Sequence, residues 1–272
     1  MNLQSLCYHL AETELIESAY KHSRLLTDFD YTKNDRLNVR EIEKSLVSFS
    51  PLQQPPFRDF NVARIQDTSC EGIVEIDRIL SENTKSHVLT TVPLGLSDAA
   101  YTLLSELGYR LLRCRSVLYS ELSMLPEPHG PQVLEIVSGN SERNLAAAFD
   151  VLNSFYPTTA DDFRRAYTYW LKDNERAELF IALAEALPVG MGILSWIGPC
   201  GFLSSGVVAP SHRGRGIQKQ LIHLRVQKGR QLGLPVLFAP GVPPFSASEA
   251  SLKGCGFQLL CTRAIWRKGL EG

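Results

Sequence analysis

The chain has almost no excess of charge of either sign, since 28 lysines and arginines balance 29 aspartates and glutamates for a formal net charge of -1. Proteins that bind nucleic acids or membrane surfaces in general present a broad basic face, which this composition does not supply. We therefore expect no nucleic acid and no membrane as a partner. One local basic pocket is still compatible with the balance.

Long apolar runs are also missing. No stretch reaches the ~18 consecutive apolar residues that a membrane-spanning helix needs. The first residues, MNLQSLCYHLAETELIES, meet Glu12 and Glu14 before any long apolar core and show no cleavage pattern. They make a poor secretion signal, so the cytoplasm is the expected location.

Cysteines are few and scattered, with no C-x-x-C pair and no group of histidines beside them. Metal sites and disulfide frameworks need closely spaced ligands or paired cysteines. We expect buried thiols and no metal site. The six positions are Cys7, Cys70, Cys114, Cys200, Cys255 and Cys261.

The length of 272 residues and the 44% hydrophobic content are typical of a soluble globular chain of roughly two domains. Three prolines and a glycine gather in Ser123–Gln132, between two patterned regions, and indicate a linker. We predict a first domain at residues 1–124, a linker at 125–132 and a second domain at 133–272.

The two halves resemble each other. An offset of 148 residues aligns His87–Leu118 with Pro235–Trp266 without a gap, and eight of the 32 positions are identical. Both segments predict a strand, a loop, a short helix, a glycine-aromatic turn and another strand. Units of this kind look alike whatever their origin, but the identities favour a duplicated domain. They are Val88/Val236, Leu89/Leu237, Ala99/Ala247, Leu104/Leu252, Gly108/Gly256, Leu111/Leu259, Leu112/Leu260 and Arg115/Arg263.

The second half predicts three successive strands, a helix and a fourth strand. Residues 177–186, 190–196 and 201–210 have strand patterns joined by tight turns. Residues 217–232 carry an apolar helical stripe, with lysines and arginines expected on the solvent side. The strand at 235–240 follows a strand and a crossover helix, so it should lie parallel to the strand before the helix.

The loop Ser211–Gly216, SHRGRG, therefore lies where a strand ends and a helix begins. The first N–H groups of a helix have no internal partners and lie at its positive end, which favours anions. Glycines let a phosphate approach the backbone, and Arg213 and Arg215 add charge. A phosphorylated cofactor is the expected ligand, although the spacing fits neither G-x-G-x-x-G, where Lys219 takes the third position, nor a Walker loop. Under the same offset residues 65–68 hold no glycine, so only the second half has this loop.

The motif resembles that of the GNAT acyltransferase superfamily, a strand ending V-x-P and then [Q/R]-x-x-G-x-[G/A] opening a helix. Val208-Ala209-Pro210 is followed by Arg213-Gly214-Arg215-Gly216-Ile217-Gln218, and KGCGF downstream looks like the family's glycine-phenylalanine turn. The resemblance covers roughly Val133–Leu270. It implies an α/β fold with a mixed sheet, GNAT-like and tandem duplicated, with a degenerate N-terminal copy.

The resemblance also implies acetyl-CoA, or another acyl-CoA, as cofactor. Its diphosphate would lie on the amides of Gly214–Lys219, and its pantetheine arm would lie beside Gly206–Val208 like an added strand. The implied activity is direct transfer of an acetyl group, in a ternary complex, to a primary amine of a small molecule or peptide. The expected cofactor-binding residues are Gly206, Val207, Val208, Arg213, Gly214, Arg215, Gly216, Ile217, Gln218 and Lys219.

Three positions depart from the family pattern. Gln218 stands where the motif has glycine or alanine, and its longer side chain is expected beside the diphosphate. Leu252 stands where many members carry a tyrosine that protonates the leaving thiolate. No glutamate occurs on the strand at 235–240, where many members carry a base. We therefore assign no catalytic residue, and expect the backbone N–H of Val208 to stabilise the tetrahedral intermediate.

Other polar groups near the expected cleft have ordinary structural explanations. Residues 155–171 look like the helical cover of the acceptor cleft, but charged residues there also suit a solvated helix face. Glu185 suits a turn better than a remote base, and the serines suit a loop and a helix cap. Packing or surface roles are expected for both histidines and for the remaining aromatic residues. These residues are Tyr156, Asp161, Asp162, Arg164, Tyr167, Tyr169, Glu185, Ser246, Ser248, Ser251, His212, His223, Tyr119, Trp170, Trp196 and Trp266.

Two alternative functions compete with catalysis. A non-catalytic CoA or acyl-CoA sensor, or an interaction protein, on the same fold is favoured by the missing tyrosine and glutamate. RNA binding by HRGRG would need repeated copies with interleaved aromatic residues, and this chain has one copy. Homodimer formation stays open, because the two halves can also pair within one chain.

Overall fold

The computed structural model describes residues 38–43, 45–49, 62–65, 69–91, 96–125, 134–155, 168, 171–172 and 174–269. The chain divides into two compact units. Unit 1 combines Met1–Arg115 with Cys261–Gly272, and unit 2 is Ser116–Leu260. Almost all of the predicted linker, 125–132, lies outside the described residues. No helix in the described ranges is long and apolar enough to cross a membrane.

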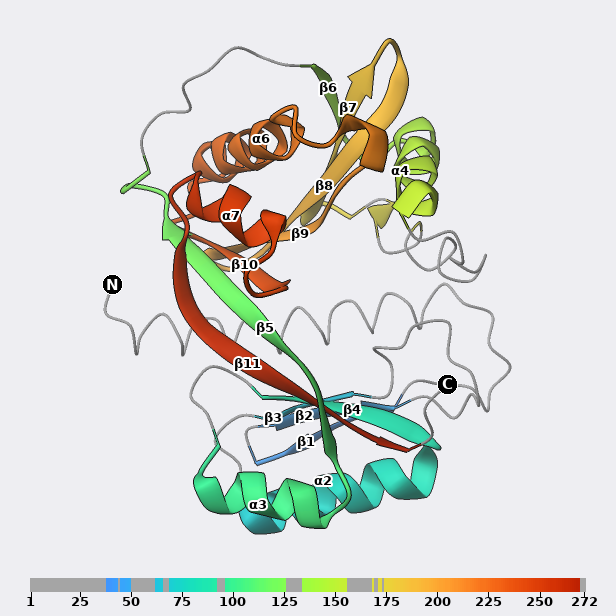
Figure 1. Ribbon diagram of the computed structural model, residues 1–272, viewed down its shortest axis with the longest axis vertical. Helices are drawn as coiled ribbons and strands as arrows, with labels where there is room; N and C mark the ends of the chain where they lie inside the picture. The colour runs from blue at the N-terminus through green and yellow to red at the C-terminus, as the bar shows by residue number, and fades with distance from the viewer. Residues whose placement is uncertain are drawn as a thin grey trace. The chain divides into compact units, whose positions relative to one another are not determined.

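Unit 1 is a sheet with helices α2 and α3 on one face (Figure 1). The strand order is β1-β2-β3-β4-β11. Neighbouring strands are antiparallel except β3 and β4, which are parallel because α2 forms the crossover between them. The elements are β1 Asn38–Ile42, β2 Ser45–Phe49, β3 Val62–Ile65, α2 Cys70–Asn83, β4 Ser86–Thr91, α3 Asp98–Glu106 and β11 Gln258–Gly269.

Unit 2 repeats this plan with more strands, in the order β5-β10-β9-β8-β7-β6. Here β9 and β10 are parallel with α6 as their crossover, and the other neighbours are antiparallel. The three predicted strands, the helix after them and the parallel fourth strand are thus confirmed. The elements are β5 Arg110–Glu121, β6 Glu135–Ser138, α4 Glu142–Phe155, β7 Ala177–Ala184, β8 Leu187–Ile197, β9 Cys200–Val208, the 3-10 turn Pro210–His212, α6 Ile217–Gln231, β10 Val236–Val242 and α7 Ala247–Lys253. The boundary between the units falls within two strands, since β5 up to Arg115 belongs to unit 1 and β11 up to Leu260 belongs to unit 2.

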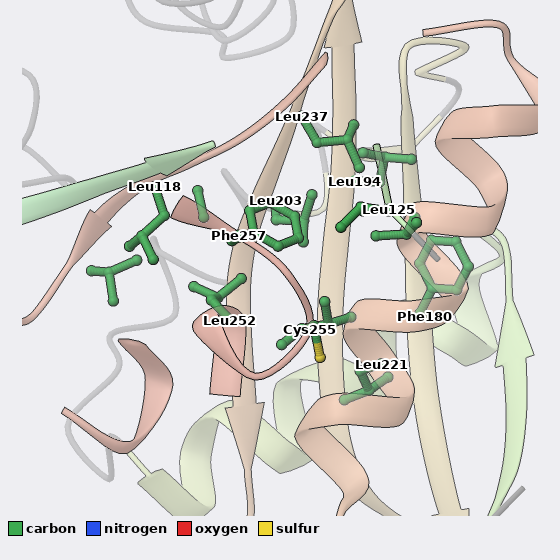
Figure 2. Packing of buried hydrophobic residues seen from close by; sticks show 14 of the residues in the cluster. Leu118, Leu125, Phe180, Leu194, Leu203, Leu221, Leu237, Leu252, Cys255 and Phe257 are labelled. Carbon is green, nitrogen blue, oxygen red and sulfur yellow. The ribbon is translucent and has the colours of Figure 1, made fainter. Parts of the chain in front are cut away.

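The sheet of unit 2 is covered on both faces, as α6 and α4 lie on opposite sides of it in Figure 1. Because successive strand residues point to opposite faces, Phe180 packs in one cluster and Leu179 and Ile181 in another. The first cluster joins α6 and α7 to the sheet, and Figure 2 shows Leu221, Cys255 and Leu194 among its members. The second cluster joins α4 to the other face.

The internal repeat recurs in three dimensions. After α3, Gly108 has φ 86° and the next residue, Tyr109, donates its N–H to the carbonyl of Leu104. After α7, Gly256 has φ 89° and Phe257 donates in the same way to Leu252. Both turns need a left-handed residue, which glycine adopts without strain. The glycine-aromatic identities therefore mark one helix-ending turn used twice.

Two strands are exchanged between the copies. In chain order α3 leads into β5 and α7 leads into β11, yet β11 pairs with β4 and β5 pairs with β10. Each sheet is thus completed by the strand that follows the other copy's last helix. The compact units differ from the predicted domains at this point, because residues 116–124 belong to unit 2 and residues 261–272 to unit 1. The division at 125–132 stays a prediction.

Unit 1 buries a chain of polar side chains. His87 is hydrogen bonded through Nε2 to the Tyr109 hydroxyl at 2.7 Å, and Tyr109 donates to Asp77 at 2.9 Å. Lys268 of β11 donates to both oxygens of Asp77 at 2.7 and 2.8 Å. Burial lowers the pKa of His87 to about 4, with the Asp77 charge opposing this shift. Burial also raises the pKa of Tyr109, so the neutral imidazole and the phenol are the native forms at neutral pH.

Candidate functional site

The loop before α6 is built around two left-handed glycines. Pro210–His212 forms one 3-10 turn after β9, and Gly214 and Gly216 then have φ 76° and 78°. Gly216 is the N-cap of α6, a position where residues with a side chain rarely take this conformation. A Cβ on Gly214 would meet no atom within 4 Å, so this glycine is needed for backbone shape and not for space.

The amides of this loop have no partners among the described residues. The main-chain N–H groups of Gly214 to Lys219 donate no hydrogen bond there, and no side chain caps the helix. The first helical bond runs from Gln220 to Gly216 at 3.1 Å. Arg215 is exposed, and Arg213 donates its Nε to the Val208 carbonyl at 3.3 Å. The loop therefore offers a run of free donors at the positive end of a helix.

A gap in strand pairing lies next to this loop. The parallel pairing of β9 with β10 runs only from Cys200 to Phe202, while β9 continues to Val208. The register of β8 and β9 shifts between Met191 and Ile193, and Ser205 has φ 50°, which marks a β-bulge. We call the β10-facing edge of residues 203–208 the β9 slot. It has main-chain groups that an extended ligand can pair with.

Gln218 turns toward the strand instead of standing beside the loop. Its Nε2 lies 2.6 Å from the point where a Cβ on Gly206 would stand. Its Oε1 is buried without a hydrogen-bond partner. Gly206 leaves room for this longer side chain against β9, and its place relative to a bound diphosphate stays a prediction. The amide of Gln218 stays open.

Unit 1 differs at both features. All four residues of β3 pair with β4, from Val62 opposite Val88 to Ile65 opposite Thr91, so the described part of β3 leaves no slot. At the start of α2 the carboxylate of Glu43 accepts from the N–H of Ser69 at 2.8 Å and from its hydroxyl. The Ser69 oxygen in turn accepts from Gly72. The helix start that corresponds to the glycine loop is thus already capped by an acidic side chain.

Comparison with known proteins identifies the part of the chain that holds the loop. The Acetyltransferase (GNAT) family profile matches residues 145–257. This part of the chain is a GNAT domain. A search of curated proteins gave no significant match.

Solved structures extend the GNAT fold beyond that segment. A GCN5-related N-acetyltransferase from Kribbella flavida aligns at 13% identity and TM-score 0.62, over 92% of this chain and 96% of that one. One from Sphaerobacter thermophilus aligns at 15% and 0.62, over 84% and 82%. A tandem GNAT protein from the clavulanic acid biosynthesis pathway aligns at 11% and 0.58, over 89% and 86%. The predicted tandem GNAT-like α/β fold is confirmed.

Within the GNAT domain the predicted cofactor residues form one continuous edge of the fold. Gly206 is exposed and Val207 and Val208 are half-buried along the slot, and the loop residues 213–216 are exposed. Ile217 is an exception, because its side chain is 2% exposed in the core and only its amide faces the loop. Their role in binding stays a prediction.

The candidates for catalysis mostly have structural roles. Glu185 is exposed in the turn between β7 and β8, with φ 50°. Ser246 is the N-cap of α7 and accepts from Glu249, and Ser251 donates to the Ala247 carbonyl. Leu252 is 4% exposed in the core, so no hydroxyl stands at that position. Tyr156, Asp161, Asp162, Arg164, Tyr167, Tyr169 and Trp170 lie outside the described residues.

The remaining candidates are packing residues. Both histidines are half-buried, and burial lowers the pKa of His223. Trp196 packs against the unit 2 core and Trp266 against the unit 1 core. Tyr119 donates its hydroxyl to Gln258 at 3.4 Å.

One functional candidate was missed. Arg225 was expected on the solvent side of α6, but it is 2% exposed and lies against the sheet. The signal in the sequence is its spacing, four residues after Leu221 and one before Val226, on the apolar stripe.

Proposed function

We propose that unit 2 binds an acyl-CoA, with acetyl-CoA as the first choice, and transfers its acyl group to a primary amine. The observation that carries the proposal is the run of six amides from Gly214 to Lys219 at the start of α6, which have no partner in the part of the chain that the structure describes. Diphosphate oxygens are strong acceptors that such a loop accommodates, and the arginines of the loop add positive charge. The residues present therefore fit this ligand.

The β9 slot suits the extended arm of the same ligand. The arm carries amide groups, so it can pair with the main chain of Gly206–Val208 as an added strand would. The described residues of unit 1 show a capped helix start and a fully paired β3, so we propose one cofactor site in each chain. When bound, the thioester supplies an activated carbonyl and a thiolate leaving group.

In the proposed reaction the residues of the chain orient the thioester and stabilise the negative charge that develops on its carbonyl oxygen, and we assign proton transfer to none of them. A lysine-like amine with a pKa of about 10.4 is unprotonated in only about one molecule in a few thousand at neutral pH. A base or a chain of waters would recover part of that factor. The N–H of Val208 is our candidate donor for the carbonyl oxygen as negative charge develops on it. We assign no base, and we propose direct transfer to a small-molecule or peptide amine within a ternary complex.

The experiment has two stages that separate the enzyme from a sensor. Calorimetry first measures acetyl-CoA binding to the full chain, and thiol release is then followed over a panel of primary amines, corrected for hydrolysis without amine. An N-acetyltransferase releases thiol faster with at least one amine, and mass spectrometry finds the acetylated product. Tight binding with no acceleration by any amine favours the sensor, and no binding overturns both.

A further inference from the structure

Arg225 is a buried positive charge near the middle of α6. Its side chain is 2% exposed, and within the described ranges its guanidinium donates hydrogen bonds only to main-chain carbonyls. Nε bonds to Leu221 at 2.9 Å, and Nη1 bonds to Ile193 at 3.4 Å and to Ser204 at 3.3 Å. Among the described residues no carboxylate pairs with it. The Ser204 bond fixes the charge against β9 within the segment that borders the slot.

The strands are shaped around this side chain. A Cβ on Gly192 of β8 would lie 2.8 Å from the Arg225 Cζ and 3.0 Å from its Nε. A Cβ on Gly206 of β9 would lie 3.6 Å from Nη2. The Ser204 hydroxyl and the Gln218 Oε1 are also buried without a partner. The Arg225 guanidinium and the Gln218 side chain therefore both lie against Gly206, on the side of β9 that α6 covers.

Stability does not explain an arginine at this place. An ion buried without a counter-ion destabilises a fold, and an apolar side chain of similar volume is often at least as stable. Burial lowers the pKa of Arg225 to about 10, which still leaves the guanidinium charged at neutral pH. Buried charges of this kind cluster at functional sites.

The titratable groups around Arg225 do not neutralise it. The titratable group that acts on the pKa of Arg225 is the thiol of Cys255, which follows α7 and packs near Leu221 (Figure 2). Burial raises the pKa of Cys255, with Lys219 and Arg225 acting in the opposite direction, so the thiol is neutral near pH 7. Lys219 is itself an exposed cation. Among the groups that the structure describes, no negative charge therefore compensates the field of Arg225 on β9.

We propose that Arg225 is a positioning residue whose charge, acting through the backbone of β9, lowers the pKa of the coenzyme thiol in the slot. This inference depends on the proposed function. In acyl transfer the amine nitrogen forms the C–N bond, the C–S bond breaks with its electron pair on sulfur, and the amine proton passes to solvent. A nearby positive charge stabilises that thiolate. Such help replaces protonation by a tyrosine, because the corresponding position holds the buried Leu252.

The test compares the affinities of CoA and desulfo-CoA, which differ only in the thiol, by calorimetry from about pH 6 to about pH 9. If the bound thiol is more acidic than the free one, the ratio of the two affinities rises with pH between the two pKa values. We expect a bound thiol pKa about one unit below the free value of roughly 8.5, a tenfold change in the ratio. Arg225→Met should abolish the rise, and Arg225→Lys should keep most of it.

Arg230→Met is the matched control, because Arg230 lies on the same helix but donates to the carbonyls of Leu122 and Leu125. It should leave the pH dependence as in wild type. Arg225→Met should unfold at the same temperature or higher, which a purely structural role would not allow. A rise of equal size in wild type and Arg225→Met overturns the inference and leaves the proposed function standing. If Arg225→Met fails to fold, wild type decides, since an unshifted thiol pKa in wild type overturns the inference. Absence of CoA binding to wild type overturns the proposed function itself.

Discussion

Replacing Gly216 by aspartate tests the cofactor loop through charge alone. Gly216 is the N-cap of α6 with φ 78°, a left-handed conformation. Asparagine and aspartate enter this region more readily than other residues with side chains, so Gly216→Asn is a control of the same shape. The two variants differ only in whether a negative charge stands beside the free amides.

The expected loss of affinity follows from the geometry of the helix start. A carboxylate at the N-cap would lie about 5 Å from a diphosphate that carries about two negative charges. At an effective dielectric constant of about 40, between those of a protein surface and water, the repulsion is about 3 kcal/mol. That corresponds to an increase in Kd on the order of a hundredfold. Fold stability should change little, because attraction of the carboxylate to the helix dipole offsets the left-handed strain.

Calorimetry of acetyl-CoA binding to wild type, Gly216→Asn and Gly216→Asp gives the comparison, with thermal unfolding as the control for folding. The Asn variant should bind within severalfold of wild type and the Asp variant on the order of a hundredfold more weakly. Added salt should narrow the difference, because both charges lie at the surface. Equal affinity of the Asn and Asp proteins would refute the assignment of this loop.

Three further predictions concern the two units. The pKa of His87 is lowered from 6.5 to about 4 in the folded protein, so as pH falls the unfolded chain is protonated at a higher pH than the folded one. Up to about 3 kcal/mol of unfolding free energy should therefore be lost as pH falls between these values. Denaturant unfolding against pH checks this, and His87→Gln should flatten the curve; an unchanged slope contradicts it. Calorimetry should find one acetyl-CoA bound per chain, and two sites in wild type would refute the one-site proposal. Glu43→Gln should not create a second site, although it should weaken the cap of α2 by less than about 1 kcal/mol. Removing residues 261–272 takes away the partner of β4 from Ile265 to Gly269, so proteolysis should degrade unit 1 while acetyl-CoA binding survives; an unchanged digestion pattern would count against this reading.

The elements around the site could be predicted because their signals are local. Strands of the GNAT domain show apolar runs between turn residues, and α6 begins after a glycine loop whose conformation few other residues adopt. The helix-ending turns at Gly108 and Gly256 are also local. Each is formed by a glycine, by the aromatic residue that follows the glycine and by the leucine four residues before the glycine. Local patterns of this kind determine where elements begin and end.

The buried side of α6 could not be predicted in the same way. A pattern that places charged residues in solvent assigns Arg225 to the surface. The structure buries it because Gly192 and Gly206, on two different strands, leave space for the guanidinium and β8 and β9 offer carbonyls to it. The position of the Gln218 side chain likewise depends on the space that Gly206 leaves. These contacts join residues far apart in sequence, so they are a property of the folded sheet.

The exchange of β5 and β11 has a physical reason in the buried charges. The two strands share the positions Leu111/Leu259, Leu112/Leu260 and Arg115/Arg263, so their local patterns do not tell which sheet each completes. The side chains that contact the C-terminal ends of the two strands differ, and they indicate which sheet each strand completes. Asp77 of α2 needs a cation, and β11 brings Lys268 to it, whereas the corresponding end of β5 offers Ser120 and Leu122.

The reverse arrangement would be unfavourable in both units. It would leave the Asp77 carboxylate buried without Lys268. The loss would be smaller than the about 3–5 kcal/mol that breaking a fully buried pair costs, because the Lys268 side chain is 29% exposed. It would also bring Lys268 into unit 2, toward the apolar surroundings of Leu122. Helix α6 of that unit already buries a cation, because Arg225 stands at the position that corresponds to Asp77 under the 148-residue offset. Arg225 and Lys268 would then lie in one unit, and in the other the Asp77 carboxylate would keep the Tyr109 hydroxyl but lose its cation. The exchanged pairing keeps Lys268 with Asp77. It leaves Arg225 as the only buried positive charge behind the β9 slot among the described residues. The proposed effect of Arg225 on the thiol requires this condition.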